Sequence, residues 1–280
     1  MIISYLYVVF LILISITAVA SSGWDDNEGA TTARGMNLPS FFEAKDLYRA
    51  YQDIQQEYHS KLKDDDGNGN NWQILNTRQG VEVSLLQHPS DPTCPYVKMT
   101  AVMPAPPQEC WDFLQLDQWE TTMPLMDPFY EGVDTYGDYF FEGTNMTLAR
   151  KRTKRILGAF GKRDFAFVSV GHKSNDEDDV LLSGTVSVIT EDVIPRQPGY
   201  TRAFQDSIAF YRPLPNDQTH LTIICRIDLN DSYGEGGSMP MWLYVKTIGT
   251  TATRSILNLQ RELQRRRQHQ TESGSTTKRL

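Results

Sequence analysis

A long amphipathic pattern near the carboxyl end of the chain constrains the fold most. Apolar side chains recur there at steps of three and four residues, at Trp242, Val245, Ile248, Ala252, Ile256, Leu259 and Leu263. This spacing predicts a helix of about seven turns with one apolar face. A helix of this kind must bury that face against another layer of structure. We therefore ask what the preceding chain supplies as the second layer.

Short strand-like segments fill most of the chain between residues 72 and 229, and polar loops such as residues 174–179 separate them. Val81 and Val83, for example, alternate with polar neighbours. Because most connections are short, the strands are predicted to pair antiparallel. Pro107 suits the first turn of a short helix between them. The sequence thus predicts an α+β domain, in which a curved antiparallel sheet wraps around the C-terminal helix and leaves a gap for a ligand.

The amino-terminal residues have the composition of a targeting segment. Residues 1–20 carry no charged side chain and end in Ala18-Val19-Ala20, which is typical of a secretory signal peptide cleaved before Ser21. The same stretch could instead remain as a signal anchor in the membrane. The chain is therefore predicted to enter the secretory or endomembrane system or to be extracellular, with a membrane-anchored form as the alternative.

The remaining segments are assigned from composition and periodicity. Residues 21–37 are predicted to be a linker, residues 38–63 an N-terminal amphipathic helix, residues 72–265 the main domain, and residues 266–280 a basic flexible tail. Ser40 and Glu43 fit a capping box at the start of the N-terminal helix. Its apolar face consists of Leu47, Tyr51, Ile54, Tyr58 and Leu62.

The composition argues against several classes of function. The 280-residue chain has a net charge of -8, which disfavours general nucleic-acid binding, and a monomer is expected. Its five histidines are scattered, and no HExxH, GxSxG or phosphate-binding glycine motif is present. We therefore predict no catalytic residue, no cofactor and no metal site.

Two further residue types bear on the secretory prediction. The odd count of three cysteines, Cys94, Cys110 and Cys225, fits either one disulfide with one thiol or three core thiols. Asn145 and Asn230 each begin a glycosylation sequon. Both sites are predicted to carry glycans if the chain enters the secretory pathway.

Four segments in the expected order carry a family resemblance. They are Trp72 to Val83, Asp127 to Glu131 with Met126 before them, Arg163-Asp164-Phe165, and the ending built from Asp228, Gly237, Pro240, Trp242 and Leu243. Together they resemble the START family, the steroidogenic-acute-regulatory-related lipid-transfer domains. The resemblance covers about residues 72–265. It implies a helix-grip fold and the non-catalytic binding and transfer of a hydrophobic lipid in an internal tunnel.

The resemblance also implies which residues line that tunnel. Phe165, Phe167 and Ser169 share one face of a strand, and START relatives turn this face toward the tunnel. The long helix would act as a lid, with Trp242 and Val245 toward the lipid and Ile248 beside them. From the residues alone, the phenylalanines and the helix stripe fit an ordinary core equally well.

The identity of the lipid is left open. Ser169 stands where sterol-binding members have a buried arginine, and Met123 stands where phosphatidylcholine-binding members have an arginine. Arg226 is a candidate to bind the polar head group, although the more apolar face of its strand is the opposite one.

A basic segment precedes the Arg-Asp-Phe motif. Leu157 and Phe160 are predicted to enter a membrane at a flexible turn. Their predicted partners, which would meet lipid phosphates, are Lys151, Arg152 and Lys154. The alternative is a solvated charged strand. Arg163 and Asp164 are predicted to form a structural pair.

Two other functions compete with lipid transfer. An enzyme on a helix-grip scaffold would need a titratable pair inside the cavity, and the sequence offers none clearly. The other alternative is a ligand-gated protein-interaction module anchored by residues 1–20, and an empty, collapsed tunnel would favour it.

Overall fold

The computed structural model describes residues 36–38, 42–63, 72–89, 91–155, 161–173, 180–230 and 241–276. The predicted signal segment and the sequence Leu157 to Phe160 lie outside these residues. No helix in the described ranges is long and apolar enough to cross a membrane. The elements in chain order are β1 (Met36–Asn37), α2 (Ala44–Lys63), β2 (Gln73–Arg78), β3 (Val81–His88), β4 (Asp91–Met103), α3 (Pro107–Phe113), the 3₁₀ helix η2 (Leu116–Gln118), α4 (Trp119–Met126), β5 (Tyr130–Phe141), β6 (Thr144–Thr153), β7 (Arg163–Lys173), β8 (Leu181–Ile189), β9 (Thr201–Leu214), β10 (Gln218–Asp228) and α5 (Met241–Thr276).

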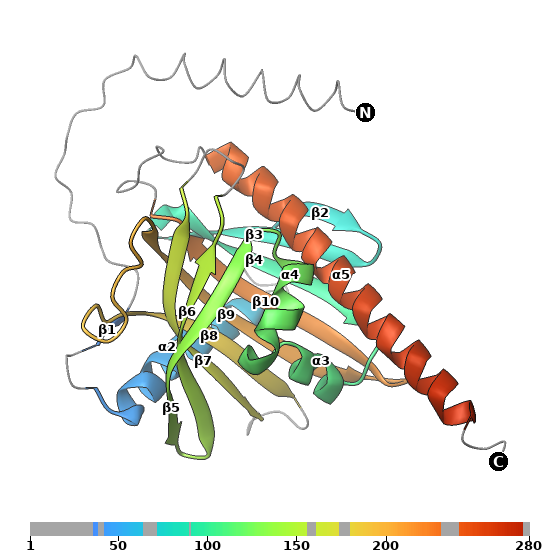
Figure 1. Cartoon of the computed structure of the whole chain (residues 1–280). Helices are drawn as coiled ribbons and strands as arrows, with labels where there is room; N and C mark the ends of the chain where they lie inside the picture. Colours follow the sequence, from blue (N-terminus) through green and yellow to red (C-terminus); the bar gives the residue numbers. More distant parts are fainter. Residues whose placement is uncertain are drawn as a thin grey trace. The chain divides into compact units, whose positions relative to one another are not determined.

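Nine of the strands form one curved sheet in the order β2-β3-β4-β10-β9-β8-β7-β6-β5 (Figure 1). Sequential neighbours along this path pair antiparallel. Two short parallel contacts complete it: β7 pairs with β9 at the start of both strands, and β1 pairs with β8. The predicted α+β helix-grip fold, with a curved antiparallel sheet and a long C-terminal helix, is confirmed.

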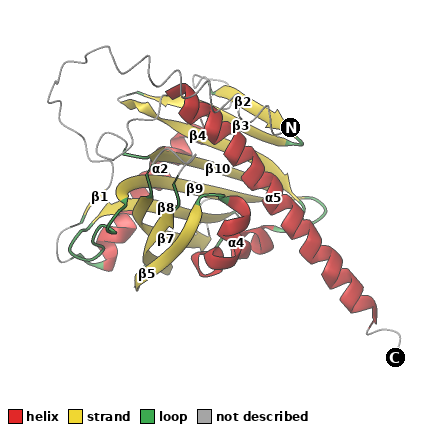
Figure 2. Ribbon diagram, turned by 45° about the horizontal axis from the view of Figure 1, so that its top comes forward, coloured by secondary structure: helices red, strands yellow, loops and turns green. Residues whose placement is uncertain are grey.

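Two helices cover opposite faces of this sheet (Figure 2). On one face, α2 packs against strands β5, β7, β8 and β9, and its side chains Leu47, Tyr51 and Tyr58 are fully buried. The predicted apolar stripe of this helix is thus confirmed at three positions. The capping box differs from the prediction, because Asp46 accepts a hydrogen bond from the Glu43 backbone N–H. The helix therefore starts at Ala44, one turn later than a cap at Ser40 would place it.

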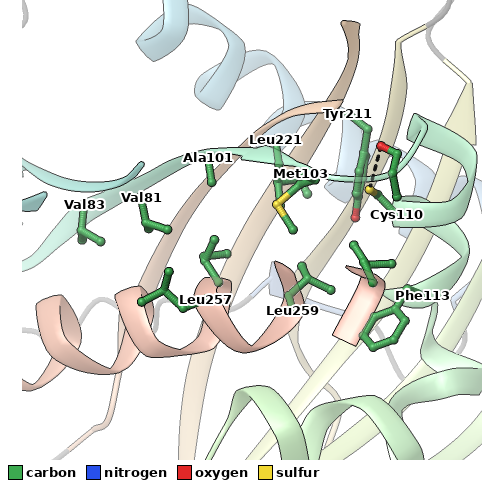
Figure 3. Close-up of a cluster of buried hydrophobic side chains, with 14 of the residues drawn as sticks. Val81, Val83, Ala101, Met103, Cys110, Phe113, Tyr211, Leu221, Leu257 and Leu259 are labelled. Atoms are coloured by element: carbon green, nitrogen blue, oxygen red, sulfur yellow. Dashed lines mark hydrogen bonds between the residues drawn. The ribbon is translucent and has the colours of Figure 1, made fainter. Parts of the chain in front are cut away.

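On the other face, α5 crosses β2, β3 and β4 and contacts α4. At the middle of α5, Leu257 and Leu259 belong to one buried cluster with Val81 and Ala101 of the sheet (Figure 3). The helix is 36 residues long, so it exceeds the predicted seven turns and includes residues 266–276 of the predicted tail.

The helical continuation of α5 is fixed by contacts of two arginines. Arg267 donates a hydrogen bond of 2.6 Å to the Pro104 carbonyl oxygen, and the guanidinium of Arg266 lies 4.5 Å from the centre of the Phe113 ring. These contacts explain why a polar, basic sequence without an apolar stripe remains helical here.

The short helices and β1 differ most from the sequence prediction. The helix beginning at Pro107 is present as predicted. The helical segment from Leu116 to Met126 was not predicted, because it is short and contains Pro124. Residues 36 and 37, assigned to the linker, pair with β8 instead, and the Leu38 N–H continues this pairing to the Ile189 carbonyl at 3.1 Å.

Candidate functional site

A cavity of about 300 Å³ lies between the sheet and the N-terminal half of α5. Strands β4 and β6 to β10 provide its floor, α4 contributes Trp119, and α5 contributes Ile248, Ala252 and Ile256. Most of the lining is apolar. The sheet is packed tightly under the C-terminal half of α5, so the cavity is confined to the other half of that helix.

The structure brings three of the predicted lining residues together at this cavity: Phe165, Ser169 and Ile248. Phe167 is buried beside the cavity, where its ring stacks on that of Trp119 with centroids 5.4 Å apart. Phe167 therefore supports the wall and does not line the cavity. Val245 of α5 is half-buried outside the lining. The side chain of Trp242 lies outside the described residues.

Lys151 lies inside the cavity, which corrects its prediction as a membrane-docking residue. It is opposite Phe165 in the β6–β7 register, and its residue is only 8% exposed. Because successive side chains on a strand alternate between faces, Arg150 and Arg152 point the other way, where both pair with Asp134. The basic run thus divides into one cavity residue and two residues paired on the opposite face.

Of the other predicted docking residues, Arg152 is half-buried and pairs with Asp134 at 3.2 Å, and its contact with a membrane stays a prediction. Lys154 is exposed, directly after the end of β6. Leu157 and Phe160 lie outside the described residues.

The Lys151 ammonium forms the polar end of the cavity. Its Nζ lies 3.3 Å from Asp127 Oδ2 and 3.3 Å from Gln205 Oε1. It also lies 5.1 Å from the centre of the Phe165 ring. A lysine ammonium has three N–H donors, so these two acceptors in the described part of the chain leave one donor for a ligand. Asp127 Oδ1 accepts a hydrogen bond of 2.9 Å from the Phe129 N–H, so both oxygens of this carboxylate are engaged.

The strand period alone does not identify Lys151 as a cavity residue. Phe165 was assigned to the cavity face, but the pairing of β6 with β7 that places Lys151 opposite it is not visible in the sequence. Asp127 and Gln205 come from segments 24 and 54 residues away from Lys151, which no local pattern connects.

Arg163 and Asp164 are each structural, but they do not pair with one another as predicted. Adjacent residues on a strand face opposite sides. Arg163 donates to the carbonyl oxygens of Leu229 at 2.7 Å and Gly161 at 2.8 Å. Asp164 instead forms a buried pair with Arg202 at 3.0 Å.

Arg226 lies on the face of the sheet away from the cavity. Its guanidinium is 5.3 Å from the centre of the Tyr96 ring, 3.6 Å from an Asp91 carboxylate oxygen and 3.4 Å from the Cys94 carbonyl oxygen. It is Cys225 and Ile227, the two neighbours of Arg226, that line the cavity. The prediction that Arg226 contacts a head group in the cavity is therefore corrected by strand alternation.

All three cysteines are buried and none is in a disulfide, which favours the core-thiol alternative. Burial raises the pKa of Cys110 to about 11 and that of Cys225 to about 12. Of the two sequon asparagines, Asn145 is exposed on β6. The Nδ2 of Asn230 donates a hydrogen bond of 2.9 Å to the Arg202 carbonyl oxygen. Glycosylation of either asparagine stays a prediction.

Comparison with known proteins identifies the fold. No protein-family model and no curated protein sequence matches the chain. Among solved structures, human StAR-related lipid transfer protein 5 superimposes with a TM-score of 0.63 at 20% identity, covering 78% of this chain and 98% of that one. Human STARD10 gives a TM-score of 0.60 at 13% identity, covering 76% of this chain and 81% of that one.

A third structure agrees with these two. The lipid transfer and protein localization domain of human StarD13 (DLC2) gives a TM-score of 0.56 at 17% identity, covering 76% of this chain and 95% of that domain. The class that this fold defines is the helix-grip domain. More particularly, the chain shares the fold of these StAR-related lipid transfer structures.

Proposed function

We propose that this domain binds a hydrophobic lipid beneath α5 and transfers it between membranes without chemical change. One observation carries the proposal: among the described residues, the mostly apolar cavity lining contains one ion pair, the buried Lys151 with the half-buried Asp127. This arrangement suits a molecule with a long apolar body and a polar group beside Lys151. The likeness to lipid transfer domains in solved structures supports the same assignment.

The charge of the polar end favours an uncharged head group. Lys151 and Asp127 neutralise one another, so the pair offers one N–H donor and no net positive charge. A hydroxyl or carbonyl group can accept that hydrogen bond without burying a further charge. A phosphate would carry an uncompensated negative charge into the cavity, which is costly.

Binding is favoured over catalysis by the same geometry. Lys151 and Asp127 are a titratable pair inside the cavity, the feature expected of an enzyme. However, both oxygens of Asp127 already accept hydrogen bonds, one from Lys151 and one from the Phe129 backbone. A carboxylate engaged in this way holds the lysine in place and is poorly disposed to accept a proton from a substrate.

Transfer requires contact with a membrane, because burial of a lipid chain is strongly favourable. An eighteen-carbon chain buried at about 0.8 kcal/mol per CH₂ gains roughly 14 kcal/mol, so release into water would be very slow. In this proposal α5 acts as the lid. Lys154 and Arg155, which are exposed after β6, attract the anionic surface, with about 1 kcal/mol from each. Leu157 and Phe160 follow them in sequence and remain predicted membrane contacts.

The test is to expose the purified full chain to vesicles of mixed phospholipids, sterol and long-chain alcohol. After re-isolation, native mass spectrometry should find one lipid per chain, and the bound lipid should be uncharged. A chain that remains empty under these conditions would overturn the proposal. Bound anionic phospholipid would preserve lipid binding but overturn the preference for an uncharged head group.

For localisation, we propose the secretory or endomembrane route, supported by the composition of residues 1–20. N-terminal sequencing of the protein from cells should find Ser21 first. Retention of Met1 in membrane-bound protein would show a signal anchor in place of a cleaved peptide.

A further inference from the structure

The cavity beneath α5 adjoins a second, more polar hollow. This hollow has a volume of about 740 Å³ and lies between α3, η2 and the strands β6 and β7. Two side chains, Gln115 and Ser169, line both spaces. They therefore form a partition between an apolar chamber and a polar one.

The partition presents hydrogen-bonding groups that the protein does not use. Within the described residues, the Ser169 hydroxyl has no hydrogen-bond partner. Gln115 donates from Nε2 to the Trp111 carbonyl oxygen at 3.0 Å, which leaves its Oε1 as an acceptor at the partition. Gly171 permits this arrangement, because a Cβ at that position would lie 2.9 Å from Gln115 Oε1.

Other hydroxyl groups on the cavity floor are paired with one another. Thr185 and Ser207 are joined by a hydrogen bond of 2.8 Å, as are Ser183 and Tyr211. Ser169 lies directly opposite Thr185 in the β7–β8 register but takes no part in these pairs. Its hydroxyl is thus distinguished from its neighbours by being available to a ligand.

The partition and the lysine lie at separate positions along the cavity. Lys151 is opposite Phe165, and Ser169 is four residues beyond Phe165 on the same strand. At about 3.4 Å per residue, the two polar positions are roughly 14 Å apart along the strands. Phe167 lies between Phe165 and Ser169 on the same face and stacks on Trp119, which lines the cavity.

We infer that the ligand is a lipid with a hydrogen-bonding group at each end, one bound by Lys151 and the other by Ser169 and Gln115. This inference rests on the proposed function and names the ligand class of the same cavity. A ligand with one polar group would leave the donor of Ser169 and the acceptor of Gln115 facing an apolar chain. A second ligand hydroxyl at the partition can accept a hydrogen bond from Ser169 and donate one to Gln115, which an apolar chain end cannot do, so it is favoured there. The adjoining polar hollow gives that end access to water.

The experiment compares dodecanol with the matching α,ω-dodecanediol by titration calorimetry on the full chain. The readout is the ratio of the diol dissociation constant to the dodecanol dissociation constant. The two probes in water are the same for every variant, so their hydration cannot change the ratio between variants. A change in this ratio therefore reports how the protein binds the second hydroxyl of the diol. The ratio should rise by about fivefold to tenfold in Ser169→Ala and in Gln115→Leu, as expected for the loss of one net hydrogen bond.

The matched control is Ser60→Ala, which removes an exposed serine hydroxyl from α2 on the opposite face of the sheet. Its ratio should equal that of the wild-type chain. Thermal unfolding of each variant verifies that it is folded, and the two partition variants test the inference independently. A ratio unchanged in both would overturn the two-ended ligand while leaving lipid binding intact. If wild-type protein binds neither probe nor any vesicle lipid, the proposed function fails and the inference fails with it.

Discussion

Two ion pairs, each with a buried cation, occupy opposite faces of the same end of the sheet, and they differ in how completely their hydrogen bonds are satisfied. Arg202 contacts both oxygens of Asp164, at 3.2 and 3.0 Å, and also donates to the Ile194 carbonyl oxygen. The Gln197 N–H adds a further hydrogen bond to Asp164. In contrast, Lys151 makes one contact with Asp127, at 3.3 Å, beside a cavity.

The difference distinguishes a structural pair from a binding pair. The side chains of Arg202 and Asp164 are 5% and 0% exposed, and their planar two-point contact leaves no space for a ligand. The side chains of Lys151 and Asp127 are 11% and 22% exposed and retain one N–H donor toward the cavity. Burial of charge alone therefore does not identify a functional site; incomplete hydrogen bonding at a cavity does.

The largest expected effect is on stability, from breaking the structural pair. Arg202→Met should lower the free energy of unfolding by about 3–5 kcal/mol, because Asp164 would remain buried without its cation. Chemical denaturation monitored by circular dichroism measures this loss. A loss below about 1 kcal/mol would show that the two pairs do not differ as described.

Asp206 is a further buried acid to compare with Asp164 and Asp127. It accepts a backbone hydrogen bond from Ser187 at 2.7 Å. Burial raises its pKa to about 7, an effect that Glu57 increases and that the Ser187 N–H and Arg226 oppose. An acid whose pKa is higher in the folded than in the unfolded protein binds a proton on folding. Stability should therefore decrease as the pH rises from about 4 to about 7, by roughly 1.4 kcal/mol per unit of pKa change, and then stay level.

The difference between wild type and Asp206→Asn isolates this contribution from that of the histidines, several of which have a lowered pKa. The variant should gain stability relative to wild type as the pH rises across that window. Parallel curves of unfolding free energy against pH for the two proteins would contradict the assignment.

For the binding pair, the main effect should be on affinity. Lys151→Met should weaken binding of a long-chain alcohol by about tenfold to a hundredfold, because a hydrogen bond from a charged group is lost. Its effect on stability should be smaller than that of Arg202→Met, since Asp127 is partly exposed. Calorimetry measures the affinity, and Lys246→Met, at an exposed lysine of α5, provides the matched control. Equal affinities for Lys151→Met and the control would show that Lys151 does not bind the ligand.

The smallest expected effect comes from Arg226→Gln. This residue pairs with Asp91 at 3.6 Å on the face away from the cavity, so the smallest effect expected is the one on lipid affinity. Lipid affinity should stay within about twofold of wild type, a change of less than 0.5 kcal/mol. A tenfold loss of affinity in calorimetry would show that the head group binds on the face of the sheet that carries Arg226.

These pairs also show which features of the fold and the site can be predicted from the sequence. The strand and helix periods identify the faces of β7 and α5, and the family resemblance supplies the order of elements, so the fold is predictable. The same alternation places Arg226 on the opposite face of β10 from Ile227, which lines the cavity. The partners of Lys151 and Asp164 are not predictable, because they depend on strand register and on residues 24, 54 and 38 positions distant. The cavity itself depends on where α5 separates from the sheet, which its uninterrupted apolar stripe does not reveal.

The most direct test of the account is a crystal structure of the full chain loaded with a long-chain alcohol. The account predicts ligand density beneath the N-terminal half of α5, with the ligand hydroxyl within about 3.2 Å of Lys151 Nζ. The Asp127 contact with Lys151 should remain in place, and the Arg202 pair should be unchanged. A ligand bound elsewhere, or one whose hydroxyl points away from Lys151, would contradict the central claim that this ion pair is the polar end of a lipid site.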